Sequence, residues 1–158
     1  MIRTIYKIIL ILLIQGLTSC GYNPIFSEKN YNFEINQTSF SGEKEINQVI
    51  ESKFNLIRNN QSIKKKKYDL EINSSKVRKI ISKNSKGDPL KFEMNISVDF
   101  KIISNRNLLL NKEIKKKSIY NNISDLFELE QNEKIIIENI SENISDIIFS
   151  SIINLDDN

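Results

Sequence analysis

The sequence predicts an α+β fold in which two helices pack on one face of a four-stranded, mostly antiparallel sheet, in the order β-α-β-β-β-α. Four stretches alternate apolar with polar residues, which is the period of a half-buried strand. Two other stretches repeat apolar residues at helical spacing. The chain has 158 residues, 39% of them hydrophobic, and this is enough for a single domain with a modest core.

The first strand is predicted where apolar residues alternate with polar ones, at Tyr31, Phe33 and Ile35. The first helix is predicted over residues 43–60, because the apolar period lengthens there. Ser41 is its predicted N-cap, and Asn59-Asn60 is its predicted end. One helical face consists of Ile46, Val49, Ile50, Lys53, Phe54 and Ile57, and only Lys53 among them is polar.

The second strand is predicted to follow the lysine run Lys64–Lys67. Alternation begins at Tyr68 and continues less regularly as far as Ile81. The sequence SKNSKGDP, residues 82–89, is the clearest turn in the chain, because glycine, asparagine and proline suit special backbone angles.

The third strand is the most regular one. In KFEMNISVDFKI, residues 91–102, every second residue is apolar, which predicts one buried face and one solvated face. Residues 105–107 are predicted to turn the chain into a fourth strand, Leu108–Tyr120.

The last element is predicted to be a long helix capped by Ser124 or Asp125. Glu128 follows Asp125 by three residues, as in a capping box, and acids here suit the positive end of the helix dipole. A stripe at helical spacing is predicted to pack against the sheet; it consists of Ile136, Ile137, Ile140, Ile144, Ile147, Ile148 and Ile152.

The N-terminus has the features of a signal peptide. A basic start, MIRTIYK, precedes an apolar run of about ten residues, which fits a secretory signal and is too short to span a membrane. Leu17-Thr18-Ser19-Cys20 resembles the lipobox of bacterial lipoproteins, in which the cysteine thiol is alkylated by diacylglycerol and the chain is cut before it. The alternative is an accidental cysteine near a cleavage site. Gly21 replaces the aspartate that commonly retains lipoproteins in the inner membrane.

This resemblance divides the chain into three parts. Residues 1–19 are the expected lipoprotein signal peptide, 20–30 a lipidated tether, and 31–158 a single α+β domain. Acyl chains on Cys20 would anchor the protein stably, because each buried CH₂ contributes about 0.8 kcal/mol. The expected location is the periplasmic side of the outer membrane.

The composition of the chain argues against two classes of function, nucleic-acid binding and catalysis. Without the first 19 residues, 23 − 2 = 21 basic residues face 20 acidic ones, a balance that argues against nucleic-acid binding. The chain has no histidine, Cys20 is its only thiol, and no cofactor, metal or catalytic motif occurs. We therefore expect a binding or assembly component without enzyme activity, cofactor or metal. A hydrolase that uses a carboxylate pair such as Glu128/Glu130 is the less favoured alternative.

Basic residues gather in three places. Two are the runs Lys64–Lys67 and Lys115–Lys117, for which protection of edge strands from aggregation is the favoured explanation. The third set flanks the predicted turn at 82–89, and for it binding of a phosphorylated anion and protection of edge strands are favoured equally. It consists of Arg78, Lys79, Lys83, Lys86 and Lys91.

Several short motifs, in this order, resemble the alphaproteobacterial form of the LPS-assembly lipoproteins (LptE). Cys20-Gly21-Tyr22-x-Pro24-Ile25-Phe26 resembles the family's CGF-x-PLY start. The Gly87-Asp88-Pro89 hairpin precedes the strand 92–102 as in that family, Asn107–Leu110 resembles its GKVLL strand start, and Ser118–Asn121 resembles its SYN ending before the last helix.

The resemblance implies a non-enzymatic subunit of the outer-membrane lipopolysaccharide translocon. Such proteins plug a large β-barrel partner, LptD, help to assemble it, and are thought to bind lipopolysaccharide. The candidate lipopolysaccharide-binding residues here are Arg78, Lys79, Lys83 and Lys86. Leu129 departs from relatives that place a base at the start of the last helix. The alternative function is an accessory lipoprotein of another outer-membrane system, for phospholipid transport or β-barrel assembly.

Overall fold

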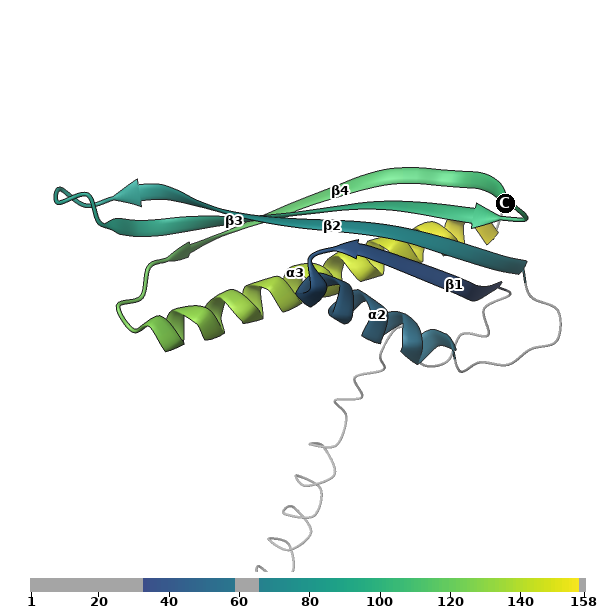
Figure 1. Cartoon of the computed structure of the whole chain (residues 1–158), viewed down its shortest axis with the longest axis horizontal. Coiled ribbons are helices and arrows are strands. Elements are labelled where there is room, and N and C mark those ends of the chain that lie inside the picture. The colour runs from purple at the N-terminus through teal and green to yellow at the C-terminus, as the bar shows by residue number, and fades with distance from the viewer. Residues whose placement is uncertain (1–32, 59–65, 157–158) are drawn as a thin grey trace, which may run out of the picture.

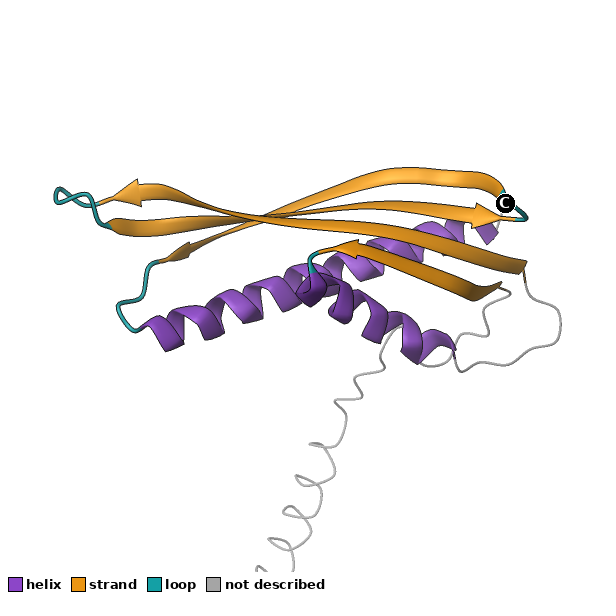
Figure 2. Ribbon diagram, in the orientation of Figure 1, coloured by secondary structure: helices purple, strands orange, loops and turns teal. Residues whose placement is uncertain are grey.

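The chain folds into two layers, a sheet and a pair of helices on one of its faces (Figures 1 and 2). The structure is a computed structural model that describes residues 33–58 and 66–156. In chain order its elements are β1 (Phe33–Gly42), α2 (Lys44–Arg58), β2 (Lys66–Lys83), β3 (Pro89–Ser104), β4 (Asn107–Asn121) and α3 (Leu126–Asp156). The predicted fold class, α+β in the order β-α-β-β-β-α, is therefore confirmed.

The four strands lie in the sheet in sequence order, β1-β2-β3-β4. β1 is parallel to β2, whereas β2–β3 and β3–β4 are antiparallel. A parallel pair needs a crossover connection, and α2 lies in this connection. β1 pairs with β2 only as far as Ser74. Beyond Ser74 the sheet has three strands, and the β2–β3 hairpin projects past the start of α3 (Figure 1).

The two hairpin turns lie where the sequence predicts them. At the β2–β3 tip, the Asn84 side-chain oxygen accepts the backbone N–H groups of Lys86 and Asp88, each at 2.9 Å. Gly87 adopts a φ of +91°, which glycine reaches without steric cost. Between β3 and β4, Asn105 and Arg106 have φ values of 51° and 66°, the left-handed pair that a tight hairpin turn requires.

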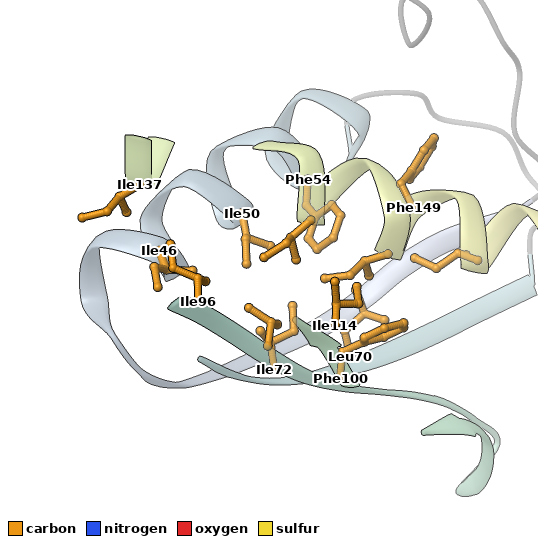
Figure 3. Close-up of a cluster of buried hydrophobic side chains, with 14 of the residues drawn as sticks. Ile46, Ile50, Phe54, Leu70, Ile72, Ile96, Phe100, Ile114, Ile137 and Phe149 are labelled. Carbon is orange, nitrogen blue, oxygen red and sulfur yellow. The ribbon is translucent and has the colours of Figure 1, made fainter. Parts of the chain in front are cut away.

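The core lies between the helices and the inner face of the sheet. All six apolar residues that alternate along β3, from Phe92 to Ile102, are buried, as predicted. Figure 3 shows side chains from both helices pointing toward those of the sheet. Ser141 and Ser145 are also buried on α3, and each hydroxyl donates to the carbonyl four residues earlier, which satisfies it within the helix. The buried isoleucines of α3 are Ile137, Ile144, Ile148 and Ile152.

Ser41 is not the N-cap of the first helix, so that prediction is wrong. Ser41 belongs to β1, and its hydroxyl donates to Asn73 Oδ1 at 3.0 Å. The first helical N–H, from Asn47, instead donates to the carbonyl of Glu43. Gly42, with a φ of +87°, ends the strand and turns the chain between Ser41 and the helix.

The cap of the last helix is confirmed. Asp125 Oδ1 accepts the backbone N–H of Glu128 at 3.1 Å, immediately before α3 begins. Three parts of the prediction for the first strand and helix lie outside what the structure describes: Tyr31, the Ile57 side chain and Asn59-Asn60.

Candidate functional site

The four candidate cations do not form one cluster. Arg78 and Lys79 are successive residues of β2, so their side chains lie on opposite faces of the sheet. Arg78 lies on the helix side, where its Nη1 is 2.8 Å from Glu133 Oε1 and its guanidinium carbon is 4.2 Å from the centre of the Phe92 ring. Lys79 lies on the open face.

Arg78 belongs to a small network that joins the sheet to α3. The Tyr120 hydroxyl donates to the same Glu133 oxygen at 2.7 Å, and the Tyr120 ring is centred 5.6 Å from the Phe92 ring. Burial, followed by the hydrogen bond to Glu133, raises the pKa of the Tyr120 phenol well above its ordinary value. We interpret Arg78 as a residue that holds the base of the hairpin to the helix.

Lys83 and Lys86 lie at the hairpin tip. Lys83 is the last residue of β2, Lys86 is in the turn, and both are exposed. Within the described part of the chain, neither forms an ion pair. Leu129 is buried in the core at the start of α3, so apolar packing accounts for this residue. Cys20 lies outside the described residues.

A shallow hollow of about 450 Å³ opens on the sheet face that the helices leave uncovered. We call it the open-face hollow. Strand pairing places Ser75, Ser97 and Lys115 in one row across β2, β3 and β4, and Val77, Asn95 and Lys117 in the next. In these rows β2 and β3 carry short side chains beside the longer lysines of β4, and this explains the depression. Its lining is Ser75, Val77, Lys79, Asn95, Ile96, Ser97, Lys115, Lys116 and Lys117.

The lining of the open-face hollow contains four lysines and no carboxylate. Carboxylates of this face occupy the rows at either end, with Glu93 at one end and Asp99 beside Glu113 at the other. Glu113 Oε2 is 2.7 Å from Lys115 Nζ, and Glu93 Oε2 is 3.7 Å from Lys117 Nζ. Hydrogen bonds, chiefly from Asn95 to Glu93 and from Lys115 to Glu113, lower the pKa of both carboxyls. Both acids are therefore ionised at neutral pH.

Lys116 is opposite Ile96, which is buried on the helix side, so the Lys116 side chain lies on that face and not on the open one. Lys79 is opposite Glu93, and its charge helps to lower the pKa of that carboxyl. The charges of the open face are therefore close to balanced. Edge protection is the favoured explanation of Lys115–Lys117 from the sequence, but the strand register also places Lys115 and Lys117 on the same face as Lys79. Aligning the two strands on the polar residues of the third, from Glu93 to Ser97, would have revealed this proximity.

The groove between the two helices has an acidic lining instead. The groove between the two helices, about 340 Å³, is lined by Lys134 and by Glu45, Glu138 and Glu142. Among the residues that the structure describes, no group of three or more acidic, histidine or cysteine side chains is placed to hold a metal ion. In the same residues, neither helix has the length and apolarity of a membrane span.

Comparisons with known proteins bear on the fold. No protein-family model matches the sequence, and no curated protein sequence matches it. The rare lipoprotein B of Shewanella oneidensis is similar in structure, with a TM-score of 0.56 and 19% identity over 76% of this chain and 98% of that one. An uncharacterized lipoprotein B of Nitrosomonas europaea has a TM-score of 0.52 and 16% identity, covering 80% and 92%.

A minor lipoprotein of Acinetobacter baumannii is also similar, with a TM-score of 0.51 and 14% identity over 75% of this chain and 94% of its own. At these identities the likeness concerns the fold alone. Almost the whole length of each of these proteins is covered, so the match includes both layers. The chain therefore has the fold of rare lipoprotein B.

Proposed function

We propose that this chain is an LptE-type lipoprotein, a non-enzymatic subunit of the lipopolysaccharide translocon that plugs the LptD β-barrel and assists its assembly. The observation that supports this most is the shared fold with rare lipoprotein B, which is LptE, over 98% of that chain. The sequence motifs from Cys20 to Asn121 add the alphaproteobacterial subtype to the proposal.

The lipobox at Cys20 supports an anchored subunit. Two or more acyl chains hold a protein stably on a membrane surface. Anchoring in the inner leaflet of the outer membrane would raise the effective concentration of the folded domain at the barrel mouth. The proposed location is therefore the periplasmic side of that membrane.

The open face of the sheet suits a water-filled barrel lumen. Most side chains on this face are polar, and some of them form ion pairs between neighbouring strands, as Glu71 and Lys101 do at 2.9 Å. A face of this kind remains stable in water and still offers hydrogen-bonding groups to a surrounding wall. The apolar face of the sheet is covered by the two helices of the same chain.

A pull-down of the tagged full-length chain from mild detergent extracts of native membranes tests this function. The expected result is co-purification with a large lipopolysaccharide-transport barrel as the main protein. Recovery of a phospholipid-transport or barrel-assembly machine instead would favour the alternative function. Cys20→Ala should leave the chain unprocessed or unanchored, and intact-mass measurement of the native product should show a lipidated Cys20 as the first residue.

Lipopolysaccharide binding at the hairpin tip is a separate part of the proposal. The double variant Lys83→Glu/Lys86→Glu should weaken binding of purified protein to lipopolysaccharide and leave barrel association intact. The matched control is Lys67→Glu/Lys112→Glu, which changes net charge equally at two exposed lysines nearer the other end of the sheet. Equal weakening in both variants would contradict a role for the tip.

A further inference from the structure

We propose that the outer edge of β2 binds an extended strand of a partner protein, which pairs with it where β1 ends. β1 pairs with β2 only as far as Gly42 and Ser74. We call residues 75–81 of β2, which follow this last pair, the free edge. The strand that suits it carries an acidic residue between β-branched apolar residues. This inference goes beyond the proposed function and does not depend on it.

The backbone of the free edge has hydrogen-bonding groups that point away from the sheet. The Ser74 carbonyl points away from β3, because it accepts the N–H of Glu43 at 3.2 Å. Backbone groups point alternately to the two sides of a strand, and the β2–β3 pairing has no register shift from Ser74 to Ile80. The N–H and C=O groups of Lys76, Arg78 and Ile80 therefore point outward as well. In the described part of the chain no strand pairs with them, so they are a template for an added strand.

Apolar side chains on the free edge also favour an added strand. Val77, Ile80 and Ile81 are β-branched, and they are 50%, 48% and 45% exposed. Val77 lies on the open face of the sheet, whereas Ile80, opposite the buried Phe92, lies on the helix side. A strand placed beside them would therefore cover apolar side chains on both faces and gain cross-strand contacts.

Two of the three cations of the free edge are held by acids of the helices. Lysine side chains often protect an edge from strand addition. Here, however, Lys76 Nζ is 3.1 Å from Glu45 Oε2, and Arg78 Nη1 is 2.8 Å from Glu133 Oε1. Both side chains are thus drawn to the helix side, which leaves the backbone of the free edge accessible.

The third cation, Lys79, indicates the chemistry of the partner. It lies on the open face opposite Glu93, and it forms no ion pair within the described residues. The free edge contains three cations and no acid, so antiparallel pairing with a second copy would set cations beside cations. Like charges opposite each other destabilise a sheet, whereas opposite charges stabilise it. A foreign strand with an acidic residue beside Lys79 is therefore favoured over a second copy of this chain.

The test is a titration of the full-length chain, purified in detergent, with the capped heptapeptide TVTETVT, followed by NMR. Its central glutamate can lie beside Lys79 with a valine on each side, whichever direction the peptide runs. Saturable amide shifts are expected along the free edge, with slower hydrogen exchange at Lys76, Arg78 and Ile80. Val77 should change little, because its N–H already faces β3. No saturable shifts, or slower exchange along β4 instead, overturns the proposal.

Two altered peptides separate strand pairing from other modes of binding. Methylation of the backbone nitrogens of the two threonines next to the glutamate removes two donors that face the edge, and should weaken binding by about tenfold or more. Replacement of the glutamate by lysine should weaken binding by about threefold to tenfold. Equal affinity of the methylated and parent peptides overturns strand pairing. Equal affinity of the glutamate and lysine peptides overturns the acidic partner.

A proline on each edge of the sheet locates the binding strand. Ile80→Pro removes one outward N–H, leaves the β2–β3 bonds in place, and should weaken peptide binding by about fivefold or more. Ile119→Pro is the matched control, because its N–H points outward from β4, the other edge, and it should change the affinity less than about twofold. Equal effects, or the reverse order, overturn the assignment to β2.

A charge swap tests the same site without proline. Lys79→Glu should reverse the preference, so that the lysine peptide binds more tightly than the glutamate peptide. Lys67→Glu, the same charge change near the other end of β2, should keep the original preference. An unchanged preference in Lys79→Glu overturns the acidic partner.

Sedimentation of the full-length chain in the same detergent tests the other occupant. The chain should sediment without self-association through this edge, so Ile80→Pro should leave its mass unchanged. A dimer that Ile80→Pro separates would assign the free edge to a second copy and overturn the proposal. Barrel co-purification is measured separately, so its failure would count against the proposed function and not against this edge.

Discussion

The two ends of the sheet differ in how they are covered. At one end, β1 completes four strands and both helices lie on the inner face, so that Leu70, Ile72 and Phe100 are at most 2% exposed. At the other end, beyond Ser74, the sheet has three strands, and Ile80, which is opposite Phe92 on the same inner face, is 48% exposed. The inner face is therefore less completely covered at the hairpin end, and its apolar side chains contribute less to stability there.

The largest loss of stability is expected for a substitution in the core at the covered end. Phe100→Ala removes a fully buried ring and should lower the free energy of unfolding by about 3–5 kcal/mol. The control at the hairpin end is Ile80→Ala on the same inner face, where the side chain is 48% exposed and the loss should be about 1 kcal/mol. Urea denaturation measures both, and similar losses in the two variants would contradict the division between the ends.

Substitution of the two described glycines with positive φ compares the same two regions, because Gly42 lies against Ser74 at the covered end and Gly87 lies at the hairpin tip. A Cβ at Gly42 would lie 1.8 Å from the Ser74 carbonyl oxygen, whereas a Cβ at Gly87 would meet nothing within 4 Å. Gly42→Ala should therefore cost about 3 kcal/mol or more, from steric overlap and left-handed strain together. Gly87→Ala has the strain alone and should cost about 1 kcal/mol. Thermal unfolding should rank the two variants in this order.

The periodic parts of the fold were predictable from the sequence. β3 was predicted almost in full because it alternates strictly, and α3 because one stripe of isoleucines runs along it. Ser41 was misplaced because serine suits an N-cap as well as a strand end, and the sequence does not show that Gly42 turns before Glu43. Burial of Leu129 follows from the packing of α3 against the sheet, which no local pattern reveals.

The site was less predictable, because it depends on register. Sequence proximity grouped Arg78 with Lys79, yet adjacent strand residues face opposite ways, and Arg78 pairs with Glu133 from the distant α3. Conversely, Lys79 and Lys117 are far apart in sequence but line the same hollow, one on β2 and the other on β4. The pairing that joins them follows from the two turns, whose exact length sets which residues are opposite.

A smaller effect is expected where the hairpin end is fastened to the helix. A double-mutant cycle with Arg78→Ala and Glu133→Gln should give a coupling of about 0.5 kcal/mol, since Arg78 is half exposed and solvent screens the pair. Glu133→Gln alone should cost about 1 kcal/mol, because its carboxylate also accepts from Tyr120. A coupling of zero would mean that Arg78 is free to serve as a ligand-binding cation after all.

A small effect at neutral pH is also expected for Tyr120→Phe, which keeps the ring contact with Phe92 and removes only the hydrogen bond to Glu133. The loss should be about 1 kcal/mol or less. Alkaline pH sharpens this test. The pKa of Tyr120 is higher in the folded chain than in the unfolded chain, where it is about 10. Its contribution is therefore complete below pH 10 and is lost as the pH rises further.

Urea unfolding at pH 8 and pH 10.5 should therefore show a smaller alkaline loss of stability for Tyr120→Phe than for the parent chain. Tyr68 also has a raised pKa, from burial and then from Asp156, so part of the alkaline loss should persist in this variant. Tyr68→Phe is the matched control at the covered end, and each variant should remove its own share. If Tyr120→Phe leaves the alkaline loss unchanged, the phenol does not titrate as a buried partner of Glu133, and the Arg78–Glu133 pair is left as the polar link between the hairpin end and α3.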